Sequence, residues 1–152
     1  ELLLVIAVIA ILASMAMPNY HKFKVRQQVD QTSDQMRDHL ELARAHAQSQ
    51  HVKVKVCPIA LSDLSSSTPT CLKQSTQWLA WMVTRKDNNS ILARAQKPSQ
   101  DISITSGLRD GVEFDERGMA SSFANATISI SSARDAQIKS ELKIAPTGRV
   151  TQ

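Results

Sequence analysis

The hydrophobic pattern at the start of the chain predicts one long helix with two different halves. From Leu2 to Met17 every residue is apolar except Ser14. Beyond Pro18, side chains of low polarity recur three or four positions apart, which is the spacing of one helix face. These are Val25, Val29, Thr32, Met36, Leu40, Ala43 and Ala47. We therefore expect a helix half that is apolar all round (1–19) and an amphipathic half (20–51), with a kink at Pro18, which removes a backbone hydrogen bond.

Short apolar segments separated by turn residues follow and predict strands. Valine alternates with lysine in residues 51–57, which indicates a half-buried strand. The other predicted strands are 78–84, 91–95, 102–105, 112–114, 127–131 and 142–145. The fold is therefore expected to be α+β, with the helix packed on one or two antiparallel sheets and residues 52–152 forming a single β-rich domain. Trp78 and Trp81 are three positions apart in one predicted strand, so we expect one in the core and the other exposed.

The apolar half and the glutamate before it suggest insertion into a membrane. Sixteen helical residues span about 24 Å, which is less than the ~30 Å hydrocarbon core of a bilayer. A secretory signal has an apolar region of similar length, but no clear cleavage site follows here and the helical pattern continues past Pro18. Glu1 stands next to this apolar run, where a carboxylate is costly unless another group neutralises it.

The two cysteines, Cys57 and Cys71, are flanked by loop-forming residues. In an oxidising compartment a disulfide between them would close a loop and contribute about 3 kcal/mol. In a reducing compartment they would be two small unpaired apolar residues. The membrane segment favours the disulfide.

The charge pattern allows a basic surface but indicates no catalytic site. The net charge is +4, with seven Lys or Arg against two Asp in residues 52–100 and an acidic excess in residues 101–133. His39, His46 and His51 lie near one another in the sequence, but their spacing matches no closed zinc site, and solvated helix histidines explain them better. No nucleophile motif and no phosphate-binding glycine loop is present. We expect neither an enzyme nor a bound metal or cofactor.

A glutamate, an apolar run, then Pro18 and Tyr20 resemble the N-terminal helix of type IV pilins and pseudopilins. In that family the glutamate is the fifth residue of the mature chain, so the leader and four mature residues would precede this sequence. With those four, the apolar segment would reach about twenty residues, enough to span a bilayer. The resemblance implies that Glu1 pairs with the N-terminal amine of a neighbouring subunit and sets the axial register of a filament. The alternative is a glutamate that only favours the helix dipole.

The remaining chain resembles the FimT/FimU branch of minor pilins and the related H-type minor pseudopilin of type II secretion. The matching features are "LARAHAQSQ" at residues 42–50, Cys57-Pro58, Cys71, the segment 78–81, "GVEFDERGMA" at 111–120 and Gly148-Arg149. Many relatives have a glycine where Ala80 stands, and many carry a late cysteine that is absent here.

This resemblance implies the type IV pilin fold and a minor pilin that helps to assemble a pilus within a priming or tip complex. Its expected partners are other pilins, the assembly platform and the prepilin peptidase. Its expected location is the bacterial inner membrane, as a single-pass protein with a periplasmic domain, and then the extracellular pilus. The alternatives are an H-type pseudopilin of type II secretion and a DNA-binding minor pilin for natural transformation.

The DNA alternative depends on a C-terminal Gly-Arg-x-Arg motif found in some FimT-like proteins. Here Gly148 and Arg149 match, but Thr151 occupies the position of the second arginine. Basic side chains that could hold phosphates beside Arg149 are Lys139, Lys143, Lys53 and Lys55. A basic surface that only improves solubility explains the same residues.

Overall fold

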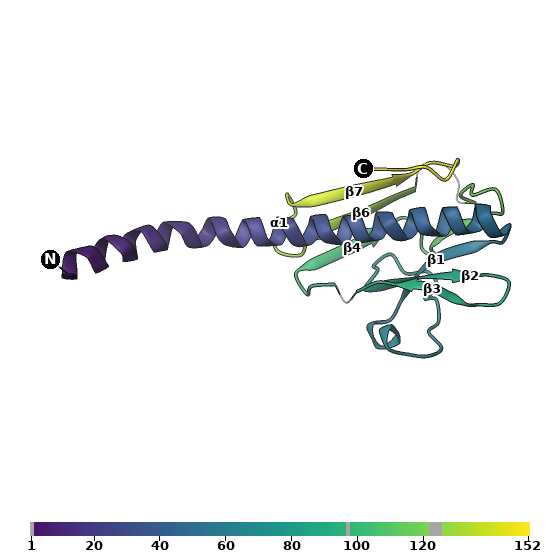
Figure 1. Cartoon of the computed structure of the whole chain (residues 1–152), viewed down its shortest axis with the longest axis horizontal. Coiled ribbons are helices and arrows are strands. Elements are labelled where there is room, and N and C mark those ends of the chain that lie inside the picture. The colour runs from purple at the N-terminus through teal and green to yellow at the C-terminus, as the bar shows by residue number, and fades with distance from the viewer. Residues whose placement is uncertain (1, 97, 122–125) are drawn as a thin grey trace.

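One long helix and two antiparallel sheets make up the chain, as the computed structural model shows for residues 2–96, 98–121 and 126–152 (Figure 1). The helix α1 (Leu2–Gln50) is continuous through residue 18. Its first half projects away from the sheets and its second half packs against them (Figure 1). A kink localised at Pro18 remains a prediction, and Glu1 lies outside the described residues.

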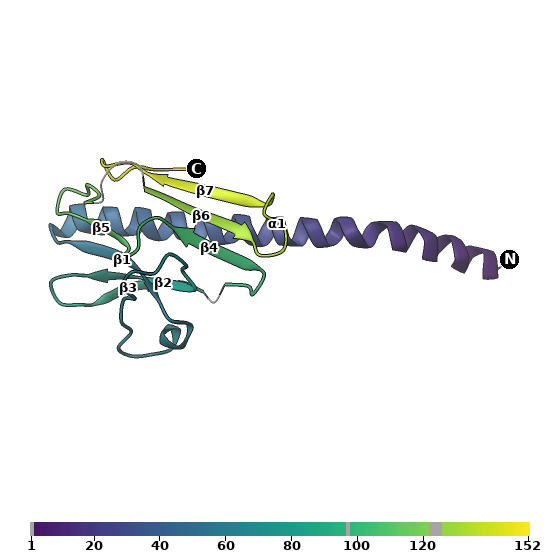
Figure 2. The ribbon, with the colours of Figure 1, turned by 180° about the vertical axis from the view of Figure 1, so that it is seen from behind.

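The strands form two sheets of four strands each. In the first sheet the order is β3-β2-β1-β5, and in the second it is β4-β6-β7-β8. The strands are β1 (Val54–Ile59), β2 (Ala80–Arg85), β3 (Ile91–Arg94), β4 (Ile102–Ser106), β5 (Val112–Phe114), β6 (Ala126–Ser132), β7 (Lys139–Ile144) and β8 (Val150–Thr151). Seen from behind, strands of both sheets lie across the packed half of α1 (Figure 2). The predicted α+β fold is confirmed, and the strand that the pattern did not predict, β8, is only two residues long.

The core forms where the stripe of α1 meets the inner faces of the two sheets. Five residues of the predicted stripe are buried, namely Val29, Met36, Leu40, Ala43 and Ala47. Thr32 is only half-buried, and the buried hydroxyl is that of Ser33, whose Oγ lies 2.8 Å from Ser140 Oγ on β7. This short polar pair can be buried because each hydroxyl satisfies the other.

The prediction that one of the two tryptophans is exposed is wrong, because both are fully buried. Trp78 lies before β2, which begins at Ala80, so the alternation of a strand does not apply to it. Its backbone N–H donates to the Ile104 carbonyl of β4 at 2.9 Å. The segment around Trp78 therefore runs along the edge of the second sheet and joins it to the first.

A disulfide between Cys57 and Cys71 ties the loop after β1 to the first sheet, with the two Cα atoms 5.6 Å apart. Cys57 and Ile59 belong to a small second core on the face of β1 opposite Val54 and Val56. The loop contains the short 3-10 helix η1 (Leu61–Leu64), and Arg94 of β3 donates to the Leu64 carbonyl at 3.0 Å. The bridge thus holds this loop over the face of the first sheet that α1 does not cover.

Candidate functional site

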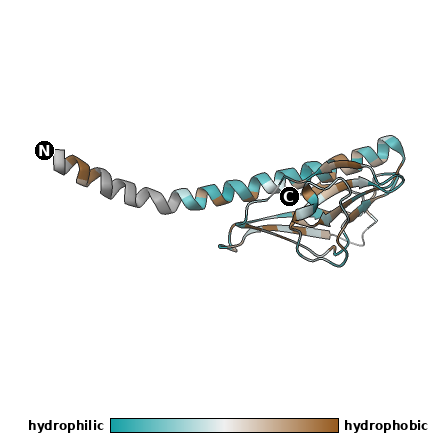
Figure 3. Cartoon of the chain, turned by 90° about the horizontal axis from the view of Figure 1, so that it is seen from below, coloured by the Kyte–Doolittle hydropathy of each residue, from teal (hydrophilic) through white to brown (hydrophobic). Residues whose placement is uncertain are grey.

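The most prominent exposed apolar surface lies on the projecting half of α1. Val5 and Ile6 are more than half exposed, and Tyr20 and Phe23 are 67% and 65% exposed. Val25 is half-buried and Val29 is buried, so the sheets begin to cover α1 at these residues, and the part of the helix before them projects (Figure 3). In the part of the chain that the structure describes, no helix has the length and apolarity needed to cross a membrane. Large exposed apolar side chains on an element that the sheets do not cover are typical of an interaction surface.

The basic residues predicted to hold phosphates fall into two groups on different sheets. Lys139 and Lys143 are exposed on β7, and Arg149 is exposed on the turn that joins β7 to β8. Lys53 directly precedes β1 and Lys55 lies within it, both in the other sheet. Lys139 is also paired with Glu141, Nζ to Oε1 at 3.0 Å. These five basic residues therefore do not form one continuous basic surface.

His39 has a structural role in the helix–sheet contact. Its Nδ1 accepts a hydrogen bond from Trp81 Nε1 at 3.0 Å, so the imidazole is neutral and carries its proton on Nε2. Burial lowers the pKa of His39 below its ordinary value, and the charge of Asp38 opposes this shift. Among the described residues no group of three His, Cys, Asp or Glu side chains is arranged to hold a metal ion.

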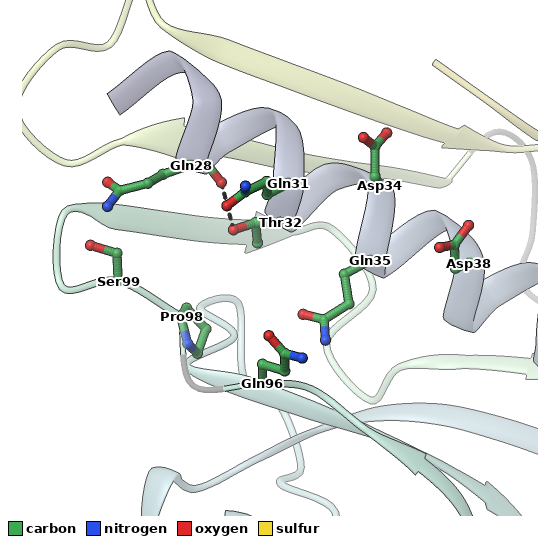
Figure 4. A pocket seen from close by; sticks show the side chains of 9 residues that line it. All are labelled: Gln28, Gln31, Thr32, Asp34, Gln35, Asp38, Gln96, Pro98 and Ser99. Atoms are coloured by element: carbon green, nitrogen blue, oxygen red, sulfur yellow. Dashed lines mark hydrogen bonds between the residues drawn. The ribbon is translucent and has the colours of Figure 1, made fainter. Parts of the chain in front are cut away.

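A polar groove of about 620 Å³ runs between α1 and the segment after β3 (Figure 4). Amide and carboxylate side chains line it from the helix, including Gln28, Gln31, Asp34 and Gln35, and Gln96 faces them from the segment. Thr32 Oγ1 in this groove donates to the Gln28 carbonyl at 2.8 Å (Figure 4). No described side chain of the lining is a histidine or cysteine.

A second groove of about 650 Å³ lies between α1 and the C-terminal segment. From α1 it is lined by Arg37, Glu41, Arg44 and Gln48, and from the other side by 148–152, which includes Arg149. Of these arginines, only Arg149 is among the residues predicted from the sequence, and the two helix arginines are not. Their spacing of seven residues places them on one helix face, and that signal could have identified them.

Two tight turns hold the wall of this second groove against the helix. Gly148 has φ +77°, and a Cβ there would collide with the Gly118 carbonyl oxygen and lie 3.2 Å from Arg44 Nε. The turn at Gly118 is itself fixed to the helix, because Gln48 Nε2 donates to the Arg117 carbonyl at 3.0 Å. The groove is therefore formed by three packed segments.

A long helix whose second half packs on two antiparallel sheets, with its first half free, defines a pilin-like fold. Two crystal forms of the type IV minor pilin FimU of Pseudomonas aeruginosa share it. One has a TM-score of 0.63 at 16% identity over 85% of this chain and 90% of that chain. The other has a TM-score of 0.56 at 18% identity over 80% and 90%. At these identities the similarity establishes the fold.

The family described as Type II transport protein GspH matches residues 32–148. The chain therefore belongs to this family of minor pilins and pseudopilins. No curated protein sequence matches the chain. The family match covers the packed half of α1 and nearly all of both sheets, and it confirms the FimT/FimU/GspH-like relationship predicted from the sequence.

Proposed function

We propose that this chain is a minor pilin that helps to assemble a type IV pilus, within a priming or tip complex. The observation that carries the proposal is the projecting half of α1. It exposes Val5, Ile6, Tyr20 and Phe23, while the globular part has a complete core of its own. A surface of this kind is buried when helices of neighbouring subunits pack side by side in a filament.

Glu1 has a specific role in this proposal. In the assembled filament its carboxylate pairs with the N-terminal amine of a neighbouring subunit in an apolar environment. Each charge then neutralises the other, and an offset of the two chains leaves both charges unpaired at a cost of several kcal/mol. The pair thereby sets the axial register between subunits.

Before assembly, the projecting helix anchors the chain in the bacterial inner membrane and the sheets lie in the periplasm. The prepilin peptidase processes the chain there, and the assembly platform adds it to the filament beside other major and minor pilins. The Cys57–Cys71 bridge supports a periplasmic location, because disulfides persist in oxidising compartments.

The family match also favours a second candidate with the same fold, an H-type minor pseudopilin of type II secretion. In that role the chain would join a short filament that exports folded proteins. The two candidate functions differ in the system into which the subunit is assembled, a type IV pilus or a type II secretion system.

Deleting the gene in the source bacterium and analysing sheared surface filaments separates them. A minor pilin should be present in the sheared fraction of the wild type, and its deletion should reduce the number of pili, with restoration by the gene in trans. Normal piliation in the deletion strain, together with loss of exported proteins from the medium, would instead establish the secretion role.

A further inference from the structure

The groove between α1 and the C-terminal segment has an excess of positive charge that the chain itself does not neutralise. Three guanidinium groups line it, those of Arg37, Arg44 and Arg149, against one carboxylate, that of Glu41. Arg37 is already paired, because its Nε lies 2.9 Å from Glu41 Oε1. Two positive charges are therefore left in the groove.

The two glutamines of the groove have partners within the chain. Gln48 donates to the Arg117 carbonyl, and Gln152 Nε2 donates to Ser140 Oγ at 2.9 Å. Arg44 and Arg149, by contrast, make no ion pair with any residue that the structure describes. Arg44 and Arg149 are thus the charged side chains of the groove that have no ion-pair partner among the described residues.

Arg44 is the less hydrated of the two unpaired arginines, so the absence of a counterion is energetically more costly for Arg44 than for the exposed Arg149. It is half-buried between the helix and the turn at Gly148, and its Nε is fully buried with no hydrogen-bond partner among the described residues. A guanidinium that has lost part of its hydration attracts an anion more strongly than a solvated one. The planar fork of an arginine also matches the two oxygens of a carboxylate.

We propose that this groove receives a carboxylate from an acidic segment of a neighbouring pilin subunit, held between Arg44 and Arg149. The inference rests on the proposed function, which supplies the neighbouring subunit. The groove is lined by the packed half of α1 and by the C-terminal segment. Both belong to the globular part (Figures 1 and 2), so this contact is separate from the packing of the projecting helices.

The surroundings favour a single carboxylate over a nucleic acid. Glu41 lies inside the groove, and on the adjacent strand β7 Lys139 is paired with Glu141. A duplex gains most of its affinity from cations that neutralise successive phosphates, which favours a run of unpaired Lys or Arg side chains. The two carboxylates interrupt such a run here.

The test uses the full chain in a neutral detergent and a fluorescent hexaglutamate peptide as the probe, with hexaglutamine as the uncharged control. Fluorescence polarisation should show binding of hexaglutamate only, weakened at least about tenfold by Arg44→Gln and by Arg149→Gln. Lys73→Gln removes one exposed charge outside the groove and should leave binding unchanged. Arg149 is exposed, so its variant still tests the groove if Arg44→Gln fails to fold.

Unchanged hexaglutamate binding in the Arg149→Gln variant would overturn the proposal. A 12-base-pair DNA duplex that binds more tightly than hexaglutamate, and is lost with the same variants, would overturn it in favour of nucleic acid. In the source bacterium, the Arg149→Gln chain should be depleted from sheared filaments relative to Lys73→Gln. Absence of the wild-type chain from filaments would contradict the pilus function, whereas equal recovery of the two variants would contradict only the groove contact.

Discussion

At the scale of single residues, the contact between His39 and Trp81 fixes α1 on the first sheet. The indole N–H of Trp81 is buried and donates to His39 Nδ1, which can accept only while the imidazole is neutral. Protonation of His39 would remove the acceptor and leave both groups unsatisfied at a buried contact.

This contact predicts a loss of stability in mild acid. Burial lowers the pKa of His39 in the folded state, so between the folded and unfolded pKa values the unfolded chain binds more protons. The contribution of His39 is therefore complete above about pH 6.5, the ordinary value, and is lost as the pH falls toward the lower folded pKa. Urea midpoints followed by tryptophan fluorescence should decrease over this range.

The variant His39→Gln cannot titrate and should show a flatter acid slope than the wild type. His21→Gln changes an exposed histidine of the projecting helix and serves as the matched control, with the wild-type slope expected. An unchanged slope in His39→Gln would show that other groups cause the acid sensitivity.

At the scale of elements, the turn between β7 and β8 depends on glycine at position 148. The residue has φ +77°, and a side chain there would collide with the backbone of Gly118. Gly148→Ala should therefore lower the free energy of unfolding by about 2 kcal/mol or more. Alanine is strained at this positive φ, and its Cβ would collide with the Gly118 carbonyl oxygen.

Gly107→Ala is the matched control for this turn. A Cβ at position 107 would have no heavy atom within 4 Å, and the φ of Gly107 lies outside the left-handed region. The substitution should be neutral or slightly stabilising. Equal effects of the two substitutions in chemical denaturation would contradict the account of the turn.

The elements also show how far local sequence patterns determine this fold. Helical periodicity located five buried residues of α1, because one face of the helix packs on the core. Short apolar segments between turn residues located seven of the eight strands, because strands bury apolar side chains and the connections between them do not. The position of Trp78 could not be predicted, because it depends on a hydrogen bond to β4, which follows much later in the sequence. The helix face of Arg37 and Arg44 could be read from their spacing, but that Arg149 lines the same groove could not, because its position depends on packing of the turns at Gly118 and Gly148.

At the scale of the whole molecule, the distribution of charge predicts little affinity for DNA. The basic candidates are divided between two sheets, and Thr151 pairs with Lys143 across β7 and β8 where a second arginine would complete the motif. Binding of the full chain to a duplex should be weak, with a shallow dependence on salt. Each added phosphate contact changes the slope of log affinity against log salt by about −0.9.

Thr151→Arg should strengthen DNA binding and steepen that slope by roughly one unit. Thr68→Arg adds the same charge to the exposed loop after β1 and should have a smaller effect. Fluorescence polarisation titrations at three salt concentrations measure the DNA affinity and its salt slope for each variant. Tight wild-type binding that Arg149→Ala abolishes would make DNA uptake the better function.

The molecule combines a globular part, which has its own buried core, with a projecting helix half that no other described part of the chain covers. The stripe of α1 and the two sheets bury their apolar residues against each other, whereas Val5, Ile6, Tyr20 and Phe23 of the projecting half are exposed. This division means that, in the filament we propose, the globular part needs no neighbour for its core, whereas the projecting helix needs neighbouring subunits to cover its apolar side chains.

The most direct test compares Glu1→Ala with Glu116→Ala, which removes the same charge from an exposed turn. Both variants should fold and reach the membrane at the wild-type level. Because loss of one partner of a buried ion pair costs about 3 kcal/mol or more, Glu1→Ala should be depleted from sheared filaments by about a hundredfold. Glu116→Ala should be recovered with the filaments like the wild type, and recovery of Glu1→Ala at that same level would contradict the account.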